Sequence, residues 1–273
     1  MKNLITRTIT GIVFVTLIIG SILFSHESFA IVFGIITILG LYEFYHLCET
    51  DGIKPMKYYG IFVGTTLFVL ISLFSMNLID KKLLLIIFPL IFLVFIFELY
   101  KKSEKPFTNI SYTIFGIFYI ALPLSLLNFI AKPNFNLGEY QYAVLLGFFL
   151  LIWIYDTGAY VFGSLLGRHK LFERVSPKKS WEGSIGGSLA CIALAYALSI
   201  FYPEIKMVDW IVVSIIIIIF GTFGDLVESL FKRSINCKDS GTIFPGHGGV
   251  LDRFDAVLLA APFVFSYLEL IKL

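Results

Sequence analysis

Acidic residues recur at helical spacing in the C-terminal part of the chain. Asp225 and Glu228 are three residues apart, and so are Asp252 and Asp255. If these segments are helical, each pair lies on one helix face, and Lys232 shares the face of the first pair. Carboxylate oxygens suit Mg²⁺, an ion that typically keeps water and bridges to substrate phosphates. The spacing therefore predicts a magnesium site between two helix ends.

A glycine-rich turn, Pro245-Gly246-His247-Gly248-Gly249, separates the two acidic pairs. A chain reversal there would carry Asp252 and Asp255 toward Asp225. Glycines on both sides of His247 leave the backbone open to close approach by a phosphate group. A network of interfacial ion pairs is the alternative, but ion pairing needs no bare backbone. No second His or Cys stands at ligand spacing from His247, which argues against zinc.

A basic loop bounded by glycines, residues 167–187, precedes the acidic pairs. Ser176-Pro177 predicts a turn within it. Lys178 and Lys179 offer ammonium groups, and Ser180 is suited to cap the following helix, whose first N–H groups would attract phosphate. Binding of anionic lipid head groups is the alternative, although it would require neither the serines nor the glycines.

Asp156 stands within an apolar segment that also contains Gly158, Gly163 and Gly167. A charge at the centre of a membrane helix costs about 2.5–3.5 kcal/mol on insertion scales, so such residues usually face the bundle interior and serve a site. The glycines equally permit close helix packing, which is the structural alternative for this segment. For Asp156 we favour a functional role.

The composition indicates which fold must position these groups. Hydrophobic residues make up 58% of the 273 residues and charged residues 15%, whereas soluble domains carry about 25% charged residues. A soluble fold is thereby excluded. The net charge of +2 gives no reason to expect a nucleic-acid partner. Because lipid offers no hydrogen-bond partners to exposed backbone, we predict an all-α, polytopic membrane bundle.

Nine segments are long and apolar enough to cross a bilayer, which takes roughly 20 helical residues. They cover about 8–24, 28–48, 59–76, 83–99, 108–130, 141–166, 184–201, 208–224 and 253–270. We expect one polytopic membrane domain (1–273). Within it, residues 1–135 supply N-terminal spans, and residues 136–273 supply the catalytic spans and cytoplasmic loops.

The loop charges orient these spans. Of the 21 basic residues, 16 fall on the side of the N-terminus. The other side holds Lys81, Lys82, Lys132, Lys206 and Lys272. Because Lys and Arg are retained on the cytoplasmic side, we expect a cytoplasmic N-terminus and a site facing the cytoplasm, in a bacterial inner or plasma membrane. Glu43, His46 and Glu98 lie near cytoplasmic span ends, where we expect them to reach water.

Motifs in the C-terminal half carry a family resemblance. They read Ser229-Leu-Phe-Lys232-Arg233, Lys238-Asp239-Ser-Gly241 and Pro245-Gly-His247-Gly-Gly249-Val-Leu-Asp252-Arg253-Phe-Asp255. Together they resemble the signature of phosphatidate cytidylyltransferases, also called CDP-diacylglycerol synthases. Further matches at 156–160, 176–183 and 224–226 extend the resemblance over most of residues 150–255, with no departure at the signature positions. The first five spans match only as hydrophobic helices.

The resemblance implies that CTP and phosphatidic acid react to give CDP-diacylglycerol and pyrophosphate in phospholipid biosynthesis, with Mg²⁺ and room for a second cation. We assign catalysis to Asp225, Lys232, Lys238, Asp252 and Asp255. The metal ligands would be Asp225, Glu228, Asp252 and Asp255. Substrate binding would involve Asp156, Lys178, Lys179, Ser180, Arg233, Asp239, His247 and Arg253.

Two other functions are alternatives. A transporter or channel would use Asp156 and Asp225 as ion ligands, but it predicts charges deep along a path rather than at one membrane face. A lipid kinase, such as a polyisoprenoid or dolichol kinase, would also use a nucleotide and Mg²⁺. The partners we expect are CTP, phosphatidic acid and the bilayer, without nucleic acid. The apolar span surfaces suit subunit contact and lipid contact equally well, so the sequence is compatible with a homodimer without requiring one.

Overall fold

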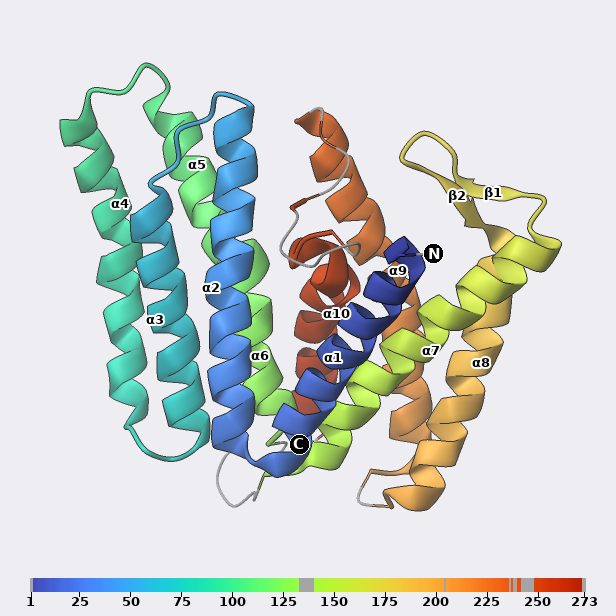
Figure 1. Cartoon of the computed structure of the whole chain (residues 1–273). Coiled ribbons are helices and arrows are strands. Elements are labelled where there is room, and N and C mark those ends of the chain that lie inside the picture. Colours follow the sequence, from blue (N-terminus) through green and yellow to red (C-terminus); the bar gives the residue numbers. More distant parts are fainter. Residues whose placement is uncertain are drawn as a thin grey trace.

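The computed structural model describes residues 2–132, 140–203, 205–235, 237, 240–241 and 248–271, with side chains from Thr8 onward. Almost all of this described part is helical, as Figure 1 shows. The helices are α1 (Lys2–Phe24), α2 (His26–Thr50), α3 (Lys57–Ser75), α4 (Ile87–Lys101), α5 (Pro106–Gly116), α6 (Leu122–Ile130), α7 (Tyr142–Leu166), α8 (Trp181–Phe201), α9 (Met207–Ser234) and α10 (Leu251–Leu270).

Two irregular helical segments adjoin these helices. A 3₁₀ segment, Lys81–Ile86, leads into α4, and a π-helical segment, Ile117–Ala121, joins α5 to α6 in one continuous run. The described residues thus form nine helical runs, one for each predicted span. Seven of these runs are long and apolar enough to cross a membrane, α1 and α10 being the other two. The prediction of an all-α polytopic membrane bundle is confirmed.

The helices form two groups in Figure 1. Helices α2 to α6 pack on one another, and α7 to α10 form the second group, in which α7 lies along α8 and α9 lies along α10. The groups meet where α6 packs against α10 and where α1 contacts both α2 and α7. An N-terminal helix therefore lies directly beside the half of the chain that carries the acidic residues.

Glycines bring α7 and α8 into close contact. A Cβ atom on Gly158 would lie 2.9 Å from the Cα of Gly187, and one on Gly187 would lie 2.7 Å from the carbonyl oxygen of Tyr155. Gly163 and Gly183 face each other one turn further along. Such backbone contact is typical of small residues at membrane helix interfaces. The packing role considered for Gly158 and Gly163 is thus confirmed.

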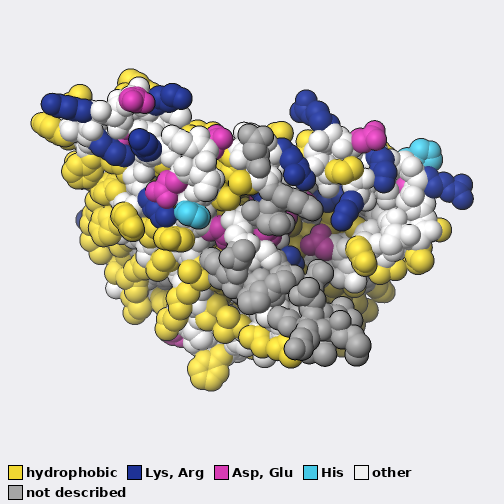
Figure 2. Space-filling view, turned by 45° about the horizontal axis from the view of Figure 1, so that its top comes forward, with side chains coloured by type: hydrophobic (Ala, Val, Ile, Leu, Met, Phe, Trp, Pro, Cys, Tyr) yellow, Lys and Arg dark blue, Asp and Glu magenta, His cyan; other side chains and the backbone are white. Residues whose placement is uncertain are grey.

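The basic loop folds as a short β-hairpin, which the sequence did not predict. Strand β1 (Lys170–Phe172) pairs antiparallel with β2 (Ser176–Ser180). The turn lies at 173–175, so the turn predicted at Ser176-Pro177 was wrong by a few residues. In the space-filling view, charged side chains gather at the end of the molecule that carries the hairpin, above a broad hydrophobic surface (Figure 2). The hairpin therefore lies on a face of the bundle that is rich in charged side chains.

Candidate active site

Acidic residues from three helices line one cavity of about 380 Å³. Asp225 comes from α9, Asp252 and Asp255 from α10, and Asp156 from α7. The cavity walls also include Lys178, Lys179, Ser180, Tyr155, Ser176 and Ser184. The structure confirms the predicted reversal, because it brings the start of α10 to the C-terminal part of α9. It also places the basic hairpin over the same cavity.

Asp225 faces a cation from the hairpin. The Nζ atom of Lys179 lies 2.5 Å from Oδ2 of Asp225. The hydroxyl of Ser229 donates a weaker hydrogen bond to Oδ1 at 3.3 Å. Both partners of the ion pair keep part of their side chains exposed, 27% for Lys179 and 34% for Asp225. The pair therefore stays within reach of water and of a ligand entering the cavity.

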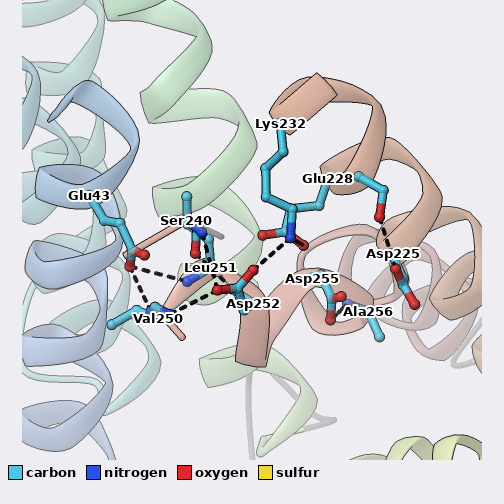
Figure 3. Close-up of polar contacts among 12 residues, drawn as sticks. Glu43, Asp225, Glu228, Lys232, Ser240, Val250, Leu251, Asp252, Asp255 and Ala256 are labelled. Carbon is cyan, nitrogen blue, oxygen red and sulfur yellow. Dashed lines mark hydrogen bonds and ion pairs between the residues drawn. The ribbon is translucent and has the colours of Figure 1, made fainter. Parts of the chain in front are cut away.

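Lys232 lies between two carboxylates behind this cavity (Figure 3). Its Nζ atom is 3.1 Å from Oε2 of Glu228 and 2.6 Å from Oδ1 of Asp252. Glu228 is buried and does not line the cavity. A largely buried cation with two acceptors is costly to disrupt because removal of one partner leaves an unpaired charge. In this arrangement Lys232 and Glu228 orient Asp252 instead of facing the cavity themselves.

Gly248 and Gly249, the described end of the glycine turn, pack against Asp252. Its Oδ2 accepts the N–H of Gly249 at 2.8 Å and the N–H of Ser240 at 3.2 Å. Gly248 has a φ of +81°, and a Cβ there would contact the Asp252 carboxylate. Glycine is required for this left-handed conformation and for this close approach. The sequence pattern linked these glycines to phosphate, whereas the two described ones pack against a carboxylate.

Asp255 reaches the cavity from the next turn of α10. Its Oδ1 accepts the N–H of Ala256 at 2.7 Å. The backbone of this turn packs against Gly224 of α9, where a Cβ atom would collide with the carbonyl oxygen of Asp255. This glycine lets α9 and α10 approach closely enough for Asp225, Asp252 and Asp255 to share one cavity.

The donor chemistry of this cavity suits Mg²⁺. Among the described residues, no group of three or more His, Cys, Asp or Glu is arranged as a ready-made metal cage. Mg²⁺ is commonly held by one or two carboxylates together with water and substrate phosphates. Asp225, Asp252 and Asp255 present such carboxylates to the cavity and are the residues that would hold the ion.

Ser180 has the predicted capping role. It is the N-cap of α8, and its hydroxyl accepts the N–H of Gly183 at 3.2 Å. The buried Ser180 side chain and the exposed Lys178 both line the main cavity. A helix start and two lysines therefore face the acidic residues, and this combination favours anion binding.

A second cavity of about 210 Å³ adjoins the same acids. It shares Asp156, Asp252 and Asp255 with the first cavity. Its remaining walls are Arg253, Trp153 and the α1 residues Thr10, Gly11, Phe14 and Val15. The acids thus lie between a cavity whose outer wall carries two lysines and a cavity that has α1 on one side. Sequence reasoning did not predict the contribution of α1, because its segment carries no motif.

Of the remaining predicted site residues, only Arg233 is described, and it is not brought to these cavities. Arg233 is exposed in the last turn of α9 and lines neither of the two cavities just described. Lys238, Asp239 and His247 lie outside the described residues.

A partly buried hydroxyl cluster at the wall of the first cavity was not predicted from the sequence. The hydroxyl of Tyr155 lies 3.0 Å from that of Ser184 and 2.5 Å from that of Thr222. These contacts join α7, α8 and α9. Tyr155 directly precedes Asp156 within the apolar segment. This adjacency was the one feature of the sequence that could have pointed to Tyr155 as a site residue.

The expectation that Glu43 and Glu98 reach water was wrong. Glu43 is 4% exposed and Glu98 is 1% exposed. The carboxamide of Asn109 donates a hydrogen bond to Glu98 at 2.7 Å. Glu43 instead contacts the segment that precedes α10. The sequence could have indicated that Glu43 is buried, because Glu43 interrupts an apolar span just as Asp156 does.

Comparison with known proteins agrees with this arrangement. A sequence model described as the cytidylyltransferase family matches residues 5–271. A phosphatidate cytidylyltransferase of Staphylococcus haemolyticus is 32% identical over 259 residues, which cover 94% of this chain and 95% of the relative. Phosphatidate cytidylyltransferases of Staphylococcus aureus and Staphylococcus epidermidis are 38% and 37% identical over 173 residues, 63% of this chain and 64% of each relative. The chain therefore belongs to the cytidylyltransferase family of nucleotidyltransferases.

Proposed function

We propose that the protein is a Mg²⁺-dependent phosphatidate cytidylyltransferase of a bacterial membrane. It would convert CTP and phosphatidic acid to CDP-diacylglycerol and pyrophosphate. The observation that carries the proposal is the meeting of two cavities at Asp156, Asp252 and Asp255. One cavity has a basic wall suited to a nucleotide, and the other has an apolar wall suited to a lipid. The names of the relatives support the same reaction.

The nucleotide would bind in the larger cavity. Lys178 and Lys179 offer charges to the triphosphate, and an entering phosphate would compete with Asp225 for the ammonium of Lys179. Mg²⁺ bound to the cavity carboxylates would neutralise charge on the phosphate oxygens. Without the cation, negatively charged phosphates would be repelled by the carboxylates of Asp225, Asp252 and Asp255.

The lipid would present its phosphate from the second cavity. Arg253 lies on the wall of this cavity, and the α1 side chains Phe14 and Val15 offer an apolar surface for the glycerol and acyl portions. Phosphatidic acid could then enter laterally without leaving the bilayer. This entrance uses α1 as well as the C-terminal spans.

The reaction requires no covalent enzyme intermediate. A phosphate oxygen of phosphatidic acid would attack the α-phosphorus of CTP, and the bond from that phosphorus to the α,β-bridging oxygen would break, releasing pyrophosphate. Catalysis then depends on holding two polyanions in line and on stabilising the charge of the transition state. Lysines above the acidic residues and Arg253 beside them are placed for this task.

The site would face the cytoplasm, where CTP is available. The hairpin lies at one end of the bundle (Figure 1), and an excess of Lys and Arg marks the cytoplasmic side. This orientation can be measured by cysteine labelling in sealed vesicles, with cysteines introduced on the hairpin.

The decisive experiment uses purified protein with phosphatidic acid and CTP labelled either in the cytosine ring or in the γ-phosphate. Mg²⁺-dependent transfer of ring label to lipid, with an equal amount of pyrophosphate, is the expected result. Transfer of γ-phosphate label alone would identify a lipid kinase instead. Asp225→Asn protein serves as the inactive control.

A further inference from the structure

A carboxylate from the N-terminal half of the chain contacts the start of α10. Oε2 of Glu43, on α2, accepts the N–H of Val250 at 2.6 Å and the N–H of Leu251 at 3.4 Å. The first N–H groups of a helix have no intrahelical partner. Helix α10 has no side-chain cap of its own at Val250. Glu43 therefore caps α10 from another helix, 207 residues away in sequence.

Two glycines fit against the same carboxylate. A Cβ atom on Gly241 would lie 2.5 Å from Oε1 of Glu43, and a Cβ atom on Gly249 would lie closer still. The backbone at Gly241 and the backbone at Gly249 thus both pack directly on Glu43. With Glu43 only 4% exposed, the contact is sealed from water.

The segment held by Glu43 also holds Asp252 (Figure 3). Gly249, next to Val250, donates its N–H to Oδ2 of Asp252 at 2.8 Å. Ser240, next to Gly241, donates its N–H to the same oxygen at 3.2 Å, and its hydroxyl accepts the N–H of Asp252 at 3.3 Å. Displacement of this backbone would therefore move the Asp252 carboxylate, and small displacements of reacting groups are costly to catalysis.

Packing alone does not explain a carboxylate at this place. An acidic group inside a membrane bundle is expensive, and an apolar side chain would fill the space at lower cost. Capping gives it a specific partner, because a negative charge at a helix N-terminus interacts favourably with the unpaired N–H groups. The partner segment carries Asp252, which lines both cavities.

We propose that Glu43 is a positioning residue for the cytidylyltransfer site: its carboxylate fixes the backbone at 249–251 and thereby aims Asp252 into the cavity. This inference rests on the proposed function only in so far as Asp252 serves the reaction. The role requires an acceptor oxygen at the length of a Glu side chain, so Gln, which keeps the oxygen but loses the charge, should partly replace Glu43, whereas Asp and Ala should not.

The test compares Glu43→Ala, Glu43→Asp and Glu43→Gln in the full-length protein in detergent. Hydrogen–deuterium exchange of the peptide covering 248–255 should accelerate about 10- to 100-fold in the Ala and Asp variants, as expected when a charge-assisted backbone hydrogen bond is lost. The kcat for lipid-bound cytidine should fall by at least about tenfold in the same variants, with KM for CTP changed less than about twofold. The Gln variant should lie between wild type and the Ala variant in both measurements, because it keeps the acceptor oxygen without the charge.

Glu98→Ala is the matched control. Glu98 is equally buried in the N-terminal half, but its described partners are Asn109 and Lys101. Its loss should lower thermal stability without accelerating exchange at 248–255 and without lowering the activity per folded molecule. If the Ala variant of Glu43 does not fold, the Asp and Gln variants carry the test.

The two readouts separate the possible failures. Unchanged exchange at 248–255 in the Asp and Ala variants would overturn the cap, and accelerated exchange with unchanged kcat would overturn the positioning role. If the wild-type protein makes no lipid-bound cytidine, the proposed function fails. The exchange measurement still decides whether Glu43 holds this backbone.

Discussion

The ammonium of Lys232 lies 2.6 Å from Oδ1 of Asp252, which ties the last turns of α9 to the first turn of α10. Glu228 supplies a second acceptor at 3.1 Å. The three side chains form a largely buried triad, in which only Asp252 lines the cavity. Asp252 therefore has its direction set by α9, by the glycine turn and, through the backbone, by α2.

Replacing Lys232 by Met should destabilise the protein strongly. It would leave Glu228 and Asp252 close together without their cation, and breaking a buried ion pair costs about 3–5 kcal/mol. Thermal unfolding in detergent should show a clear drop in Tm together with loss of activity. The double variant Lys232→Met/Glu228→Gln should recover part of the stability. A single variant as stable as wild type would contradict the buried triad.

Asp225→Asn should retain the fold and lose activity. The substitution keeps the shape of the side chain but removes the charge that faces Lys179 and the cavity. A loss of about 100-fold or more in kcat is expected for a group that stabilises charge in the transition state. Membrane insertion and Tm should stay near wild type. Full activity, or activity that persists after chelation of divalent ions, would rule out the metal assignment.

Gly187→Ala should separate α7 from α8. The new Cβ would lie 2.7 Å from the carbonyl oxygen of Tyr155 and 2.9 Å from the backbone nitrogen of Ala159, neither of which can rotate away. A destabilisation of about 1–3 kcal/mol is expected from such overpacking. Gly20→Ala in α1 is the control, because the Cβ that it adds would meet no atom within 4 Å. Equal Tm values for the two variants would contradict the close contact.

Val15→Trp should affect phosphatidic acid more than CTP. Val15 lines the second cavity but not the first, so a larger side chain there should raise KM for the lipid roughly tenfold, within the range that pocket contacts supply. Val13, also on α1 and exposed, lines neither cavity, and Val13→Trp should leave both KM values unchanged. An increase in KM for CTP alone would assign the second cavity to the nucleotide.

The sequence by itself determined the membrane bundle and the local geometry of its acids. Long apolar runs must become helices because lipid cannot satisfy exposed backbone groups, and this constraint acts whatever the neighbours are. The three-residue spacing of Asp225 and Glu228, and of Asp252 and Asp255, then places each pair on one helix face. The Ser180 cap is equally local, since it depends only on the residues at the start of α8.

Only the tertiary structure decided how those local pieces are used. It paired Lys232 with Asp252, turned Gly248 and Gly249 toward Asp252, placed α1 beside the acidic residues, and buried Glu43 against α10. Each of these contacts joins segments that are distant along the chain or depends on the course of a turn. Periodicity and local spacing carry no information on which distant surfaces meet, because that choice is made by the packing of whole helices.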